Sequence, residues 1–152
     1  MKVKILFIED NKTKADDVKL YLNNNYDDID IVIKESFTSG LKELFKNDYD
    51  LLLLDMSLPT RDGSPNNSIN NFEQLGGHKI LSEIKRKKIY IPTILITMFS
   101  EFGVGKSFMD IKELDEVLQT SFESFYKGLV YYSSREDNWQ NKLKKHINNI
   151  IE

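Results

Sequence analysis

The stretch Asp50-Leu51-Leu52-Leu53-Leu54-Asp55-Met56-Ser57-Leu58-Pro59 decides the fold. Four consecutive leucines between acidic residues predict a short strand that is buried on both faces. Such strands belong to parallel sheets covered by helices. Asp55 follows the last leucine, so it lies at the carboxyl end of the strand. Because ligands of parallel sheets bind at that edge, we expect Asp55 to belong to the functional site.

On both sides of this strand the sequence alternates between apolar runs and amphipathic segments. The predicted strands are Val3–Ile8, Ile29–Ile33, Leu51–Leu54, Tyr90–Thr97 and Leu129–Tyr132. Apolar residues at helical spacing predict the helices between them, such as Ala15, Val18 and Leu22 in the first. The spacing from Phe108 to Phe125 predicts one long helix or two short ones. This alternation predicts an α/β fold with a five-stranded parallel sheet.

Length and composition are those of one soluble domain, which we expect to span residues 1–152. Of the 152 residues, 40% are hydrophobic and 30% are charged. The absence of cysteine excludes disulfides and thiolate metal sites. A net charge of -3 gives no case for nucleic-acid binding. The first apolar run is too short for a membrane span, so we expect a cytoplasmic location.

Four polar residues are predicted to meet at the carboxyl edge of the sheet, namely Glu9, Asp10, Asp55 and Thr97. Three carboxylates that lie close together repel one another unless a cation joins them. Mg²⁺ suits such a site because it prefers oxygen ligands. The two histidines, His78 and His146, lie far apart in the chain, which argues against zinc.

These residue types point to phosphoryl chemistry. An aspartate held beside Mg²⁺ can attack phosphorus and become an aspartyl phosphate. The metal neutralises charge on the transferred group, and the hydroxyl of Thr97 would bond to one of its oxygens. Phosphoryl acceptance at Asp55 is therefore the leading hypothesis.

Three segments resemble the response-regulator receiver domains of the CheY-like family. Ile8-Glu9-Asp10-Asn11 is similar to their acidic turn, and residues 50–59 are similar to their phosphoacceptor strand. Ile91-Pro92-Thr93-Ile94-Leu95-Ile96-Thr97 is similar to their fourth strand with its switch threonine. The resemblance covers residues 3 to about 150. It implies a doubly wound, flavodoxin-like sheet with strand order 2-1-3-4-5.

The resemblance also implies roles for the acidic residues. Asp55 would take a phosphoryl group from a histidine kinase or phosphotransfer protein in a phosphorelay. Asp10, Asp55 and the backbone carbonyl of Ser57 would bind Mg²⁺ directly, and Glu9 would act through water.

Two further residues would form the switch in such a receiver. Thr97 would move toward the phosphoryl group, and either Tyr131 or Tyr132 would turn inward with it. The protein would then signal by contact with an output protein. It would not be an enzyme, beyond self-phosphorylation and autodephosphorylation.

The sequence departs from the family at one position of the site. Receivers have a lysine three residues beyond the switch aromatic, and this lysine pairs with the phosphoryl group. Here that position is Ser134 if Tyr131 is the aromatic, or Arg135 if Tyr132 is. The stretches 60–77 and 98–128 are also long, so they would either rebuild the output surface or be tolerated as surface loops.

Other functions compete with phosphoryl acceptance. A pseudo-receiver would keep the fold as an interaction module without being phosphorylated, and the missing lysine favours it. A salt bridge from Arg135 or Arg61 across the acidic site would support that alternative.

Two enzyme motifs are incomplete in this sequence. The segment Gly103-Val104-Gly105-Lys106-Ser107 ends like a nucleotide-binding loop but lacks the first glycine. A dehalogenase-type phosphatase would need a second aspartate two residues after Asp55, where this chain has Ser57.

Overall fold

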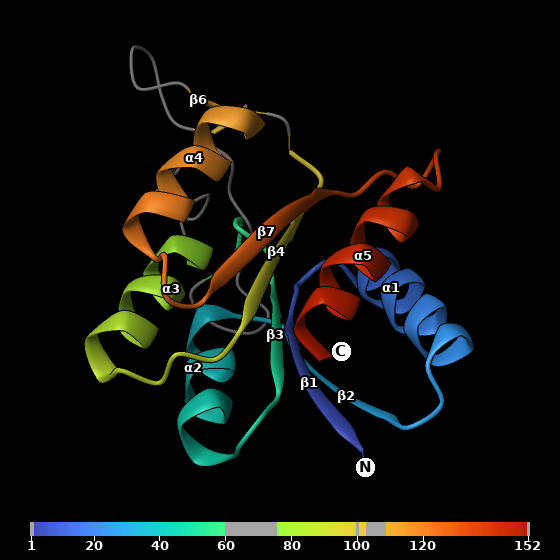
Figure 1. Cartoon of the computed structure of the whole chain (residues 1–152), viewed down its shortest axis with the longest axis horizontal. Coiled ribbons are helices and arrows are strands. Elements are labelled where there is room, and N and C mark those ends of the chain that lie inside the picture. Colours follow the sequence, from blue (N-terminus) through green and yellow to red (C-terminus); the bar gives the residue numbers. More distant parts are fainter. Residues whose placement is uncertain (1, 60–75, 100, 103–108, 152) are drawn as a thin grey trace.

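The main sheet of the computed structural model is parallel and has the predicted strand order (Figure 1). The structure describes residues 2–59, 76–99, 101–102 and 109–151. Within these ranges the sheet consists of β1 (Val3–Ile8), β2 (Ile29–Lys34), β3 (Leu51–Leu54), β4 (Thr93–Thr97) and β7 (Tyr126–Tyr131). Their order is β2-β1-β3-β4-β7, so β7 is the fifth strand of the predicted arrangement. Two short strands, β5 (Glu101–Phe102) and β6 (Met109–Asp110), form a separate antiparallel pair.

Helices cover both faces of this sheet, which confirms the doubly wound α/β fold. One face carries α1 (Lys12–Asn25) and α5 (Asn138–Ile151), as Figure 1 shows. The other carries α2 (Phe37–Lys46), α3 (Gly76–Lys87) and α4 (Ile111–Ser121). The apolar spacing between Phe108 and Phe125 predicted one long helix or two short ones. Within the described residues of this segment there is one helix, α4. None of the helices in the described ranges has the length and apolar character needed to cross a membrane.

The leucines of β3 hold the two layers together. Leu52 and Leu54 pack into the core beneath α2, α3 and α4, whereas Leu51 and Leu53 pack beneath α1 and α5. All four are fully buried. Burial of each leucine side chain contributes about 1.5–3 kcal/mol. The four-leucine run therefore places β3 at the centre of the fold.

The register of the strands aligns the residues at their carboxyl ends. Ile8 of β1 pairs with Leu54 of β3, and the backbone N–H of Asp55 donates to the carbonyl of Ile8 over 3.1 Å. Glu9 and Asp55 therefore leave neighbouring strands at the same level. On the other side of β3, Leu54 pairs with Leu95 of β4.

Three strands differ from the predicted bounds, and the smallest difference is in β2, which ends at Lys34 in place of Ile33. β4 begins at Thr93 and not at Tyr90, because Pro92 has no N–H to donate and Tyr90 has a positive φ of 51°. β7 begins at Tyr126 and ends at Tyr131, although we predicted Leu129–Tyr132. Gly128 concealed the start of this strand, since glycine weakens a strand pattern. The predicted loop from Thr60 lies outside the described residues as far as Leu75, and Gly76 and Gly77 begin α3.

Gly128→Ala is expected to lower the free energy of unfolding by about 2 kcal/mol or more. Gly128 has a φ of 145°, and a Cβ there would lie 2.5 Å from Cε1 of His146 on α5. Urea unfolding would measure the loss. Lys127→Ala, at the exposed neighbouring position, is the control and should stay within about 0.5 kcal/mol of the original protein. Equal midpoints for the two variants would contradict this packing argument.

Candidate functional site

The fold brings three carboxylates together at the carboxyl edge of the sheet. Glu9 and Asp10 follow β1 and Asp55 follows β3, and one oxygen from each lies within 4.8 Å of the others. Glu9 and Asp55 are buried, whereas Asp10 is partly exposed. His78 and His146 lie elsewhere, since the ring of His78 packs against Phe122 and that of His146 against Gly128.

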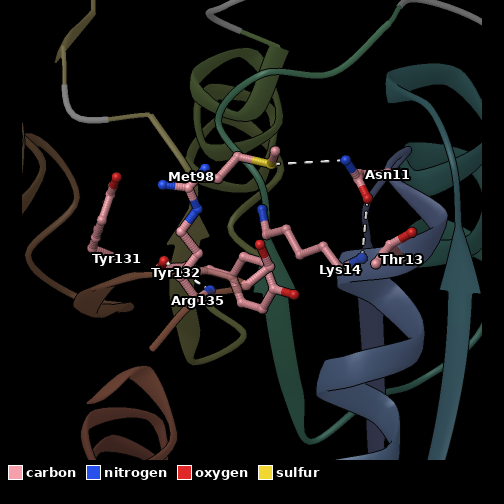
Figure 2. A pocket seen from close by; sticks show the side chains of 9 residues that line it. Asn11, Thr13, Lys14, Met98, Tyr131, Tyr132 and Arg135 are labelled. Atoms are coloured by element: carbon pink, nitrogen blue, oxygen red, sulfur yellow. Dashed lines mark hydrogen bonds between the residues drawn. The ribbon is translucent and has the colours of Figure 1, made fainter. Parts of the chain in front are cut away.

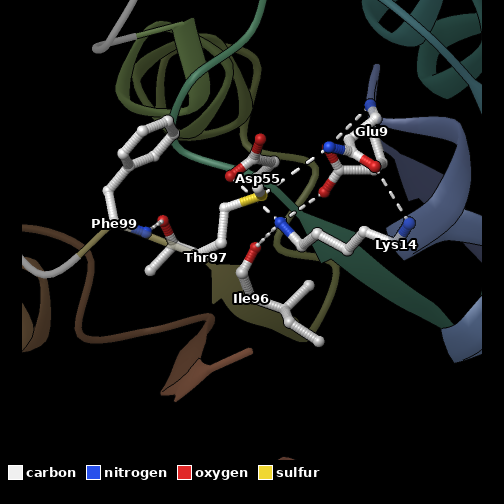
Figure 3. Close-up of polar contacts among 8 residues, drawn as sticks. Glu9, Lys14, Asp55, Ile96, Thr97 and Phe99 are labelled. Carbon is white, nitrogen blue, oxygen red and sulfur yellow. Dashed lines mark hydrogen bonds and ion pairs between the residues drawn. The ribbon is translucent and has the colours of Figure 1, made fainter. Parts of the chain in front are cut away.

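A lysine that we did not predict enters the same cluster. The side chain of Lys14, in the first turn of α1, is fully buried (Figure 3). Its Nζ forms an ion pair with Glu9 and lies 3.3 Å from Oδ1 of Asp55. The same amine donates to the backbone carbonyl of Ile96 in β4 over 2.8 Å. Lys14 therefore links the ends of β1, β3 and β4.

The start of α1 fixes the position of this lysine. Asn11 caps the helix, because its side-chain oxygen accepts a hydrogen bond from the backbone N–H of Lys14 over 3.0 Å. Lys14 lies on the buried stripe of the helix with Val18 and Leu22, at spacings of four residues. A lysine within an apolar stripe is the sequence signal that would have found it, because buried lysines almost always have partners.

Burial controls the charge of the cluster. Loss of water raises the pKa of Glu9 above its usual value, and the charge of Asp55 acts in the same direction. Lys14 opposes this rise in pKa but does not cancel it. Oε1 of Glu9 and Oδ1 of Asp55 face the amine as ion-pair partners, but neither accepts a hydrogen bond within the described part of the chain. Both oxygens therefore have capacity for a further cation.

The turn after Asp55 is packed against the start of α3. The backbone N–H of Gly77 donates to the carbonyl of Met56 over 2.9 Å. A Cβ on Gly77 would overlap the carbonyl oxygen of Asp55 and would lie 2.8 Å from Cα of Met56. Only glycine fits this contact. Ser57, whose carbonyl was predicted to bind metal, is buried in the same turn.

Thr97 lies at the end of β4, one residue beyond the carbonyl that holds Lys14. Its side chain is buried, and its Oγ1 accepts a hydrogen bond from the backbone N–H of Phe99 over 3.2 Å. Thr97 therefore follows the residue whose carbonyl accepts from the amine of Lys14, while its own hydroxyl faces the backbone of Phe99 (Figure 3).

Comparison with known proteins identifies the family. No protein-family model matches the sequence. The Detocs response regulatory protein DtcB of Enterobacter cloacae is 30% identical over 150 residues, which make up 97% of this chain and 100% of that protein. The chain belongs to the response-regulator receiver family. The uncharacterized protein y4jR of Sinorhizobium fredii is 24% identical over 143 residues, or 93% of this receiver and 95% of that protein.

Solved receiver structures share the fold. The receiver domain of a Francisella response regulator superposes with a TM-score of 0.67 at 17% identity, covering 98% of this chain and 96% of that one. The response regulator TrrA of Thermotoga maritima, solved in complex with Mg²⁺ and BeF, has a TM-score of 0.63 at 24% identity. That match covers 96% of this receiver and 99% of TrrA.

The two candidate switch tyrosines of this receiver have different surroundings. Tyr131 pairs with Thr97 in the β4–β7 register, and its side chain is 45% exposed. Tyr132 is only 3% exposed, its hydroxyl donates to Asp17 over 2.5 Å, and its ring centroid lies 5.3 Å from that of Trp139. Tyr131 is therefore the aromatic with room to turn.

With Tyr131 as the aromatic, the position of the missing receiver lysine is Ser134. Ser134 and Arg135 are both exposed and line an open pocket of about 460 Å³ (Figure 2). Asn11, Lys14 and Met98 line the same pocket. The cation that contacts Asp55 is thus Lys14 on α1, on the other side of this pocket from the expected loop. The segment Gly103–Ser107 and the other candidate cation, Arg61, lie outside the described residues.

Proposed function

We propose that this receiver accepts a phosphoryl group on Asp55 with the help of Mg²⁺ and signals by protein contact, as a stand-alone member of a phosphorelay. The observation that carries the proposal is the cluster of Glu9, Asp10 and Asp55 at the carboxyl edge of the sheet. Ligands of doubly wound folds bind at this edge.

The residues of the cluster fit Mg²⁺. All the candidate ligands are oxygens, and Oε1 of Glu9 and Oδ1 of Asp55 accept no hydrogen bond among the described residues. Asp10, Asp55 and the carbonyl of Ser57 would hold the ion, and Glu9 would act through water. When bound, Mg²⁺ would neutralise charge on the phosphoryl oxygens.

The residues of the chain would then act as follows. A carboxylate oxygen of Asp55 attacks phosphorus, a new O–P bond forms, and the bond to the donor breaks with its electron pair on the leaving group. The hydrogen bond from the backbone N–H of Asp55 to Ile8 holds the attacking residue in position. The hydroxyl of Thr97 would donate a hydrogen bond to a phosphoryl oxygen, and Tyr131 would follow it inward. Hydrolysis by water would return inorganic phosphate and the free carboxylate.

The test is phosphorylation with a small donor. The protein, incubated with Mg²⁺ and acetyl phosphate, should gain the mass of one phosphoryl group, and Asp55→Asn should abolish the gain because the amide is not a nucleophile. Asp50→Asn, at the exposed opposite end of β3, is the matched control and should be labelled normally. No mass gain in the original protein together with no Mg²⁺ affinity would contradict the proposal, as would equal labelling of Asp55→Asn.

One observation favours a second candidate function, the pseudo-receiver. The amine of Lys14 already neutralises part of the charge on Glu9 and Asp55. A site balanced in this way can be stable without metal or phosphate. Isothermal titration with Mg²⁺ separates the candidates, because a phosphoacceptor must bind the ion and a pseudo-receiver need not.

The remaining parts of the proposal follow from the resemblance. The phosphodonor would be a histidine kinase or a phosphotransfer protein, and the output partner would be another protein. Neither nucleic acid nor a membrane is part of the proposal. The protein would act in the cytoplasm, and it would be a signalling domain and not an enzyme with a separate substrate.

A further inference from the structure

Lys14 reaches Asp55 from a part of the fold where the receiver resemblance implies no cation. We infer that Lys14 contacts the phosphoryl group on Asp55 and does the work of the lysine that receivers have after their fifth strand. This inference rests on the proposed function of Asp55. It assigns the role to α1, at the opposite end of the chain from Ser134.

Distance and burial distinguish Lys14 from Ser134 and Arg135, the other candidates for the role of the missing receiver lysine. Its Nζ lies 3.3 Å from Oδ1 of Asp55, and its side chain is fully buried. Arg135 is exposed where it lines the pocket, and the hydroxyl of Ser134 carries no charge. Among the cations of the described residues, Lys14 is the one that forms an ion pair with Asp55.

The acceptors around the amine place it beside the group that would react. The carbonyl of Ile96, which accepts from Nζ over 2.8 Å, belongs to the residue before Thr97. The amine therefore contacts both the nucleophile and the strand end that carries the predicted switch residue. An ammonium group has three N–H donors, and its present partners are Glu9, Asp55 and the Ile96 carbonyl. We therefore expect one of these donors to turn from a carboxylate to a phosphoryl oxygen.

Phosphorylation increases the negative charge at Asp55, so the amine of Lys14 stabilises the site more after the reaction than before it. When Asp55 attacks phosphorus, the singly charged carboxylate becomes an acyl phosphate that carries close to two negative charges. The donor leaves with the electron pair of the broken bond. A buried amine next to Asp55 stabilises this added charge more strongly than an exposed one, because water screens it less.

A purely structural role is the competing explanation. Lys14 would then be only a counter-ion for two buried carboxylates. However, an apolar residue at this position would continue the stripe formed by Val18 and Leu22, and burial of an ion pair is costly compared with apolar packing. The two explanations also predict different results, because a lysine at position 134 could replace a group that contacts the phosphoryl group but not a buried counter-ion.

The experiment compares the original protein with Lys14→Met, Lys14→Met/Ser134→Lys and the control Lys19→Met, which removes an exposed lysine of the same helix. Each is incubated with Mg²⁺ and acetyl phosphate, and the rate of labelling is followed by intact mass. We expect Lys14→Met to be labelled about 100-fold more slowly. Ser134→Lys should restore most of that rate, and Lys19→Met should match the original protein.

Mg²⁺ titration of the same variants shows that slow labelling is not loss of the folded site. Removal of a positive charge beside the carboxylates should raise Mg²⁺ affinity in Lys14→Met by about tenfold, whereas an unfolded site would bind more weakly. Labelling of Lys14→Met within twofold of the original rate would overturn the inference. So would a loss that Ser134→Lys leaves unchanged, or weaker Mg²⁺ binding by Lys14→Met. If the original protein takes no phosphoryl group at all, the proposed function itself fails.

Discussion

Lys14→Met is expected to lower the free energy of unfolding by about 3 kcal/mol in the presence of EDTA. The substitution leaves the buried carboxylates of Glu9 and Asp55 without the amine that pairs with both. Methionine fills the space of the lysine stem, so the loss reflects charge more than packing. Urea unfolding at neutral pH would measure it.

The same variant should recover stability when Mg²⁺ is added. An ion that binds only the folded state at 100 times its dissociation constant contributes about 2.7 kcal/mol. Because the original protein also binds Mg²⁺, its stability rises too, and the gap to Lys14→Met should narrow by about 1.4 kcal/mol for the expected tenfold difference in affinity. Lys19→Met, on the exposed side of α1, should stay within about 0.5 kcal/mol under both conditions. Equal stability of Lys14→Met and the original protein in EDTA would show that the carboxylates do not depend on the amine.

Tyr132→Ala should destabilise the fold by about 3–5 kcal/mol, whereas Tyr131→Ala should change stability by about 0.5 kcal/mol or less. Tyr132 is buried between α1 and α5, where its ring packs against Trp139 and its hydroxyl donates to Asp17. Burial and the neighbouring Asp17 also raise the pKa of the Tyr132 hydroxyl, so it stays a neutral donor. Tyr131 is half-exposed and makes no comparable contribution to the core.

Thermal or urea unfolding of both variants gives this comparison directly. Tyr132→Phe serves as a control for the hydroxyl and should cost about 1–2 kcal/mol, well below the loss in Tyr132→Ala. A larger loss for Tyr131→Ala than for Tyr132→Ala would reverse the assignment. The position of the receiver lysine would then be Arg135 in place of Ser134.

Much of the site could be predicted because apolar runs end abruptly at polar residues. The leucines before Asp55 and the run before Glu9 marked both strands and the edge at which they end. Strand β1 and strand β3 have the predicted bounds. The alternation of segments was enough to predict the parallel sheet, since crossovers in such folds follow few rules.

The apolar stripe of α1 could have marked Lys14 as a buried lysine, but the partners of its amine could not be predicted. Its backbone lies in a helix, and a long flexible stem carries the amine to the ends of three strands. Spacing along the chain does not tell how far such a side chain reaches. The choice between Tyr131 and Tyr132 also needed the structure, because adjacent residues of a strand point to opposite faces and a shift of one residue exchanges them.

The most direct test of the account is a crystal structure of the protein with Mg²⁺ and beryllofluoride, which stands in for a phosphoryl group. We predict beryllium bonded to a carboxylate oxygen of Asp55, Mg²⁺ held by Asp10 and Asp55, and Nζ of Lys14 within about 3.2 Å of a fluoride. An unmodified Asp55 at saturating beryllofluoride would contradict the phosphoacceptor role. A bound group with the amine of Lys14 still directed only at Glu9 and the Ile96 carbonyl would contradict the role of Lys14.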